Sequence, residues 1–201
     1  MRITPLEAPF DPGVADALAP MMPTGVPPIA LFRTFARNLP MTRAMRGWGS
    51  YELGRELSIS MRDREILIDR TCARCGCEYE WGVHINFFAE RVGFSSAQVT
   101  SLTHGSSSDA CWSSTRDLLL VRAADALHDE STISEPLWVL LSDEFSEAEL
   151  LDILLLCGWY HAISFAANAA GVPLEPNAPT FDSVRGVDGA GSAASRGSSR
   201  I

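Results

Sequence analysis

The chain has 201 residues and a formal net charge of −9, which argues against a nucleic-acid-binding surface, because phosphate binding needs clustered Lys and Arg side chains. A hydrophobic content of 46% with 20% charged residues indicates a globular protein of one ordinary domain or two small ones. We expect no signal peptide and no membrane span, since no apolar run approaches about 18 residues. Five cysteines, an odd number, predict free or redox-active thiols in a reducing cytoplasm.

The first segment is rich in proline. Seven of the twelve prolines lie within residues 1–28. We therefore predict an irregular arm over residues 1–27 that lies along the surface or on a partner subunit. Apolar residues then recur at helical spacing between Ile29 and Leu57, and Pro40 marks a joint between two helices.

The segment 62–93 carries most of the chemistry. A helix over 62–75, with Ser60 and Asp63 as an approximate capping box, is predicted to end at a break at Gly76. A second helix is predicted from near Cys77 to Gly93, a glycine suited to the position just after a helix.

The remaining helices follow from their start signals. Short or medium helices are predicted from Ser95 to about Leu102, from Ser113 or Ser114, and from the segment 132–135. A capping box of Ser146 with Glu149 starts a long, nearly all-apolar helix over 147–170, predicted to be the central buried helix. Residues 177–201 turn to Gly, Ala and Ser, which predicts a disordered tail.

No convincing strand pattern is present, so the predicted fold is an all-α bundle of about six to eight helices over residues 28–176. The segments HINFFAERVG (84–93) and AISFAANAAG (162–171) share Ile, Phe, Ala and Gly at equal spacing. Two helical hairpins related by an internal pseudo-repeat would produce this similarity, and so would chance similarity between two amphipathic helices.

Three polar side chains of the second helix are predicted to share one face. Because each helical residue turns the chain by about 100°, Cys77, Glu80 and His84 fall on one strip at spacings of three and four. Such a strip can transfer protons, bind metal or run thiol chemistry. In the first turn, Cys77 would be favoured as a thiolate by the helix dipole.

The spacing of Glu65, Cys77 and His84 resembles the active site of the alkylhydroperoxidase D and carboxymuconolactone decarboxylase family. Twelve positions separate Glu65 from Cys77 and seven separate Cys77 from His84, as in the peroxidase branch of that family. The segments LFRTFARNL, RDREILI and LLLCGWYHAISFAANAAGVPLE also resemble longer bacterial members with a CEYEWxxH core. The resemblance covers residues 28–176 and implies an alkylhydroperoxidase D-like helical bundle that forms a homo-oligomer, such as a dimer, trimer or hexamer.

One departure separates the chain from the peroxidase branch. Glu80 occupies the place of the peroxidatic cysteine, and the Cys72–Cys75 pair lies five residues too early, before the break. The disulfide chemistry of that branch cannot run with Glu80 in this place. A lone Cys77 could still reduce peroxide through a sulfenic acid that another thiol resolves.

Three hypotheses remain open on the sequence. The first is cofactor-free acid–base chemistry, a decarboxylation or related lyase reaction on a small carboxylated or lactone substrate, as the decarboxylase branch implies. The second is an alkyl hydroperoxide-reducing thiol peroxidase with peroxiredoxin-type activity. The third is a non-catalytic helical oligomer that binds a small ligand or a partner.

The candidate residues follow from the shared helix face and from the family resemblance. The catalytic set is Glu65, Cys77, Glu80 and His84, with His84 as proton donor or base. Tyr160 and His161 are expected to complete a substrate pocket, and Arg64 or Arg70 to bind an anionic substrate. We expect no cofactor and no metal, because Cys72 and Cys75 would point well away from the face of Cys77 and His84.

Overall fold

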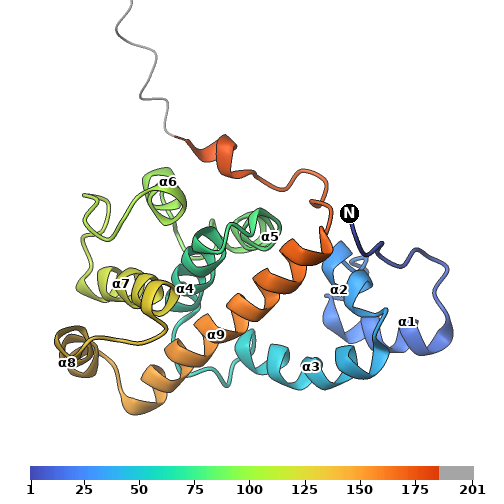
Figure 1. Ribbon diagram of the computed structural model, residues 1–201, viewed down its shortest axis with the longest axis horizontal. Helices are drawn as coiled ribbons and strands as arrows, with labels where there is room; N and C mark the ends of the chain where they lie inside the picture. The colour runs from blue at the N-terminus through green and yellow to red at the C-terminus, as the bar shows by residue number, and fades with distance from the viewer. Residues whose placement is uncertain (186–201) are drawn as a thin grey trace, which may run out of the picture.

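The computed structural model describes residues 1–185, and within that range the protein consists of nine α-helices and two short 3₁₀ helices without any strand (Figure 1). The all-α prediction is confirmed. The elements are α1 (Pro12–Leu18), η1 (Ala19–Met21), α2 (Ala30–Phe35), α3 (Leu39–Glu52), α4 (Met61–Arg74), α5 (Glu78–Phe88), α6 (Ser96–His104), α7 (Thr115–Glu130), α8 (Glu135–Glu144), α9 (Glu147–Ala170) and η2 (Phe181–Val184).

Helix α4 is the centre of the bundle. It packs against α5, α6, α7 and α9, and ten of its 14 residues are buried. Ile66, Leu67 and Ile68 are fully buried although they are consecutive, because neighbouring helices cover α4 on several sides. The polar residues of α4 therefore lie in the interior as well, and each needs a partner there.

The start signals read from the sequence are present in the structure. Ser60 with Asp63, Ser95 with Gln98 and Ser146 with Glu149 form reciprocal capping boxes at the starts of α4, α6 and α9. Each box satisfies backbone N–H groups that the first helical turn leaves without a partner. Ser114 caps α7 through Asp117 N, and Asn38 caps α3 through Met41 N.

The predicted break between α4 and α5 is confirmed at Gly76, which has a φ of 61°. The predicted end of the second helix is wrong, since α5 ends at Phe88 and turns lead on to Gly93, with a φ of 69°. In these turns Val92 N donates to Phe88 O and Phe94 N donates to Ala89 O. Only the second of the two similar ten-residue segments is thus helical up to its glycine.

The two ends of the chain are more ordered than predicted. The arm 1–27 contains α1 and η1, and its first residues are held by Arg2 N and Ile3 N, which donate to Ala170 O. The predicted tail contains the 3₁₀ helix η2, whose Phe181 ring packs on Trp81 at 5.1 Å between ring centroids. The rest of the tail, residues 186–201, lies outside the described residues.

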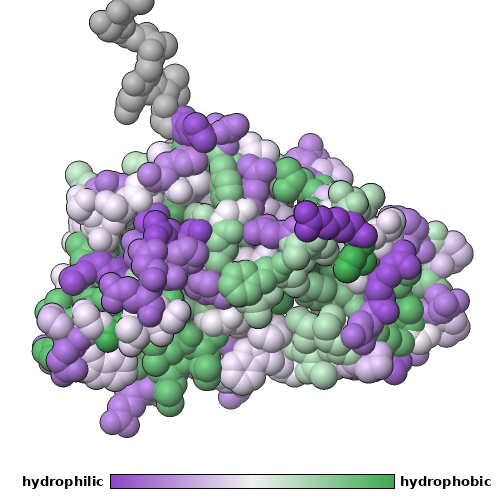
Figure 2. Space-filling view, viewed as in Figure 1, coloured by the Kyte–Doolittle hydropathy of each residue, from purple (hydrophilic) through white to green (hydrophobic). Residues whose placement is uncertain are grey.

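Helix α9 runs diagonally across the molecule in Figure 1 and packs against α4, α5, α7 and α8. By length and composition alone, α9 could cross a membrane, although we expected no apolar run of that length from the sequence. Half of the residues in its most apolar stretch are buried inside the protein, as in a core helix. Its outer side leaves Leu151, Leu155 and Phe165 exposed, and Figure 2 shows hydrophobic side chains scattered over the face in view.

Gly76 tests the importance of the break. Gly76→Ala should lower the free energy of unfolding by about 1–2 kcal/mol, because a side chain disfavours left-handed backbone. An added Cβ would meet no atom within 4 Å, so the loss would come from the backbone alone. Urea denaturation measures the difference.

Gly47→Ala is the matched control. Gly47 lies inside α3 and has equally open surroundings, so alanine there should raise the free energy of unfolding by about 0.5–1 kcal/mol. Equal effects of the two substitutions would contradict a backbone origin.

Candidate active site

The site is built around a buried chain of charged side chains from α4 and α5. Arg64 Nε donates to Glu65 Oε1 at 2.6 Å, and His84 Nδ1 donates to Glu65 Oε2 at 2.7 Å. Glu65 is completely buried and Arg64 is 4% exposed. Glu65 therefore has both oxygens occupied, one by a cation of its own helix and one by the imidazole of α5.

The other nitrogen of the imidazole faces two further polar groups. Tyr160 Oη on α9 lies 3.1 Å from His84 Nε2, and Glu80 Oε1 lies 3.6 Å from the same nitrogen. The rings of His84 and Tyr160 meet edge to face, with centroids 5.2 Å apart. Two helices, α5 and α9, thus bring an imidazole, a phenol and a carboxylate to one point.

This point forms part of the wall of a cavity of about 610 Å³, within the range of about 300–1,000 Å³ that is usual for small-molecule sites. Glu80, His84 and Tyr160 line it, while most of its wall is apolar and comes from α2, α3, α5, α9 and the end of the N-terminal arm. Its apolar lining includes Met21, Met22, Phe32, Phe35, Met45, Leu53, Phe87, Phe88, Trp159 and Ile163. Arg46 and Arg91 also line the cavity, and both are exposed to solvent.

The neighbouring carboxylates decide the charge of His84. Burial lowers the pKa of the imidazole, but the charge and hydrogen bond of Glu65, together with Glu80, outweigh burial and raise the pKa of His84 to about 10. His84 is thus an imidazolium at neutral pH. Burial and the charges of Glu80 and Glu65 raise the pKa of Tyr160 well above its usual value, so this phenol stays neutral.

Two carboxyl groups near His84 have oxygens without partners. Glu80 Oε2 is buried, and no described residue forms a hydrogen bond with it. Both oxygens of Asp69 are also buried, and no described residue forms a hydrogen bond with them. Burial, together with the charge of Glu65, raises the pKa of Asp69 well above its usual value. Unlike Asp69, Glu80 reaches the cavity, where a bound molecule can contact it.

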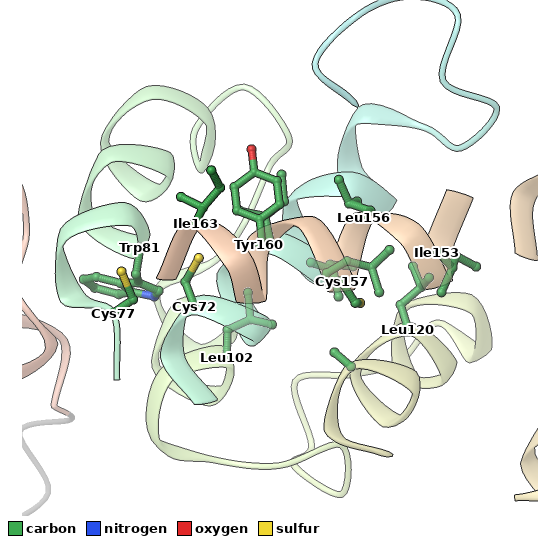
Figure 3. Close-up of a cluster of buried hydrophobic side chains, with 14 of the residues drawn as sticks. Cys72, Cys77, Trp81, Leu102, Leu120, Ile153, Leu156, Cys157, Tyr160 and Ile163 are labelled. Atoms are coloured by element: carbon green, nitrogen blue, oxygen red, sulfur yellow. The ribbon is translucent and has the colours of Figure 1, made fainter. Parts of the chain in front are cut away.

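Cys77 is not part of this arrangement, although we predicted it on the same face as Glu80 and His84. It precedes α5 as the N-cap, with φ −92° and ψ 77°, so the 100° rule for helical residues does not apply to it. Figure 3 shows Cys77 beside Trp81 within the buried apolar cluster, while the Tyr160 hydroxyl points out of that cluster. Cys77 is fully buried and does not line the cavity.

The expected thiolate at Cys77 is also wrong. Burial raises the pKa of the Cys77 thiol to about 11, in spite of a hydrogen bond from the backbone of Glu80 that acts in the opposite direction. The thiol is therefore protonated at neutral pH. All five cysteines are free.

Three other expectations on substrate contacts need correction. His161 does not line the cavity, and its ring lies beside His128 instead. Arg64 is occupied by Glu65, and Arg70 is held by Asp125 and by backbone carbonyls of α6 and the following loop. Neither arginine can receive an anionic substrate in the cavity.

Sequence reasoning missed Asp69, Arg46 and Arg91. Asp69 follows Glu65 by one helical turn, so its spacing was a usable signal. The two arginines reach the cavity from α3 and from the turns after α5. No local pattern identifies them, because the cavity exists only where the arm, α2 and α3 pack against α5 and α9.

Arg64→Met should lower the free energy of unfolding by roughly 3–5 kcal/mol, because it leaves the fully buried Glu65 carboxylate with His84 as its remaining charged partner. Chemical denaturation of the variant measures the loss.

Arg185→Met is the control, because the ion pair of Arg185 with Asp182 is exposed on both sides. This change should alter stability by less than about 0.5 kcal/mol. A loss at Arg64 no larger than that at Arg185 would contradict the importance of the buried chain.

Comparison with known proteins does not assign this chain to a family. The sequence matches no family model, and no curated protein matches it significantly. The assignment of function therefore depends on the residues of the site.

Proposed function

We propose that the protein is an enzyme of cofactor-free acid–base chemistry that decarboxylates, or cleaves in a related lyase reaction, a small carboxylated or lactone substrate. The observation that carries the proposal is the convergence of the His84 imidazolium, the Tyr160 phenol and the Glu80 carboxylate on one wall of an apolar cavity. A proton donor, a neutral hydrogen-bond donor and a carboxylate are the groups that such a reaction needs.

The roles follow from the geometry. In a decarboxylation, the bond from the substrate carbon to the carboxyl group breaks, CO₂ leaves, and the electron pair moves onto a conjugated carbonyl oxygen as an enolate. The Tyr160 hydroxyl can donate a hydrogen bond to this oxygen. His84 then delivers its Nε2 proton to the carbon and regains a proton from water. Glu65 and Glu80 keep His84 charged between turnovers.

The cavity also suggests the kind of substrate. Its apolar wall favours a hydrocarbon body, and burial of that body supplies binding energy. Arg46 and Arg91 are exposed, and neither forms an ion pair within residues 1–185, so either can attract a carboxylate to the cavity. These arginines replace Arg64 and Arg70 as candidates for anion binding.

The resemblance of the segment 62–93 to the carboxymuconolactone decarboxylase and alkylhydroperoxidase D family agrees with this proposal. The peroxidase alternative has less support. A peroxidatic thiol needs exposure and a thiolate, whereas Cys77 is fully buried and its pKa is raised. A non-catalytic ligand-binding protein would use the same cavity, but it would not need a charged His84 beside an unpartnered Glu80 oxygen.

We further propose a homo-oligomer, a dimer, trimer or hexamer, in the cytoplasm, with a small-molecule substrate and no nucleic-acid partner. Exposed apolar side chains of α8 and α9 support self-association. They are Trp138, Val139, Leu140, Leu151, Leu155 and Phe165.

Three substitutions separate the proposed function from the thiol alternative. A panel of small lactone acids and oxo acids is offered to the protein, and CO₂ release is measured. His84→Gln and Glu80→Gln should lower kcat at least about 100-fold, because they remove proton transfer or the charge that supports it. Cys77→Ser should stay within about threefold of the parent.

Peroxide consumption by the reduced protein, with thiols counted before and after, provides the opposite test. If the protein consumes peroxide with loss of thiols, and Cys77→Ser abolishes this consumption, the acid–base proposal is contradicted. If ligands change the fluorescence of Trp159 on the cavity wall but no substrate turns over, the ligand-binding alternative would replace it.

The pH profile reports the charge of His84. Because the pKa of His84 is about 10, activity that depends on the imidazolium should persist through neutral pH and fall as pH rises through about 10. In Glu80→Gln the residual activity should fall at a lower pH, since one carboxylate that raises the pKa is gone. The profile of kcat against pH measures both.

Glu90→Gln is the matched control, since Glu90 is exposed and does not line the cavity. In this variant, activity should fall at the same pH as in the parent. If activity falls at the same pH in Glu80→Gln as in the parent, Glu80 is ruled out as a group that sets the charge of His84.

A further inference from the structure

A second group of reactive side chains lies away from the acid–base site. Cys75 caps the end of α4, His128 lies near the end of α7, and His161 lies on α9. These three helices pack against one another and lie together in Figure 1. The acid–base chemistry described above uses none of these three side chains.

The three potential ligand atoms converge. His128 Nδ1 lies 3.0 Å from His161 Nε2 and 3.8 Å from Cys75 Sγ, and all three atoms lie within 4.8 Å of one another. Around a tetrahedral zinc ion, the usual bond lengths place two nitrogens about 3.3 Å apart and a nitrogen and a sulfur about 3.6 Å apart. The two distances from His128 Nδ1 each differ from these values by only a few tenths of an ångström.

The orientation of His161 is fixed by the backbone. His161 Nδ1 donates to Cys157 O at 2.8 Å, so its proton lies on that nitrogen and the lone pair of Nε2 faces the cluster. Metal-binding histidines are commonly held by this kind of bond to a carbonyl. The Phe165 ring meets the His161 ring edge to face.

The surroundings permit a cation to enter. Cys75, His128 and His161 are each half-buried, so the cluster is shielded but not closed. The nearest cation is Arg74, and its charge is balanced by Asp125 and Asp129.

We propose that Cys75, His128 and His161 form a binding site for Zn²⁺ or a similar divalent transition metal, with one coordination position left for water or another small ligand. One thiolate and two imidazoles are the donor set that suits such an ion. We expected no metal from the sequence, because Cys72 and Cys75 were predicted to point away from the face of Cys77 and His84, and the two histidines of the new site were not considered with them. The new site uses neither Cys72, Cys77 nor His84.

The proposed metal site is separate from the cavity because of helix geometry. Tyr160 and His161 are consecutive on α9 and therefore point about 100° apart. Tyr160 faces His84, whereas His161 faces α4 and α7. The competing interpretation is a plain hydrogen bond between His128 and His161 that needs no metal.

Cobalt binding distinguishes the two interpretations. The untagged, reduced full chain is titrated with Co²⁺, whose visible spectrum reports tetrahedral geometry and whose ultraviolet charge-transfer band reports a bond to thiolate. We expect one equivalent to bind with both signals, and Zn²⁺ to displace it. Cys75→Ser should abolish the charge-transfer band, and His128→Gln and His161→Gln should each weaken binding at least about tenfold.

Cys111→Ser is the control, since Cys111 is a half-buried free cysteine outside the cluster, and it should bind Co²⁺ like the parent. In a second measurement, Zn²⁺ should slow alkylation of Cys75 but not of Cys111 in the unmutated chain, as peptide mass spectrometry reads it. Failure to bind Co²⁺, binding that survives all three ligand substitutions, or unprotected Cys75 would overturn the proposal.

Discussion

The buried carboxylate of Glu65 is the constraint around which α4, α5 and the site are arranged. A charge without access to water is unfavourable unless partners surround it, and Glu65 has Arg64 on one oxygen and His84 on the other. The bond to His84 fixes how α5 lies against α4. It also holds the imidazole so that Nε2 faces Tyr160 and the cavity wall.

The break at Gly76 makes this arrangement possible. A left-handed residue turns the chain between α4 and α5, and Cys77 then enters the apolar cluster while Glu80 and His84 line the cavity. Had the helix continued, the thiol and the imidazole would have kept a regular angular relation. The turn thus separates a buried thiol from the polar side chains that the sequence places next to it.

Local signals predicted most of the fold, since capping boxes and stop glycines act within a few residues of themselves. Ser60, Ser95, Ser146 and Gly171 mark helix limits in the structure as they do in the sequence. Helical spacing placed Glu80 and His84 on one face, and the family resemblance singled out Glu65. The structure brings these three side chains together with Tyr160. Sequence reasoning failed at Cys77, whose backbone is not helical. It also failed to find the cavity, whose wall includes arm residues such as Met21 that show no periodicity.

The two proposed sites share their helices, and this limits how either can change. Helix α4 carries Glu65 and is capped by Cys75, and α9 presents Tyr160 to one site and His161 to the other. Because closely packed helices move as units, a rotation of α9 that improved one set of distances would alter the other. The hydrogen bonds of Tyr160 with His84 and of His161 with His128 therefore act together to set the rotation of α9.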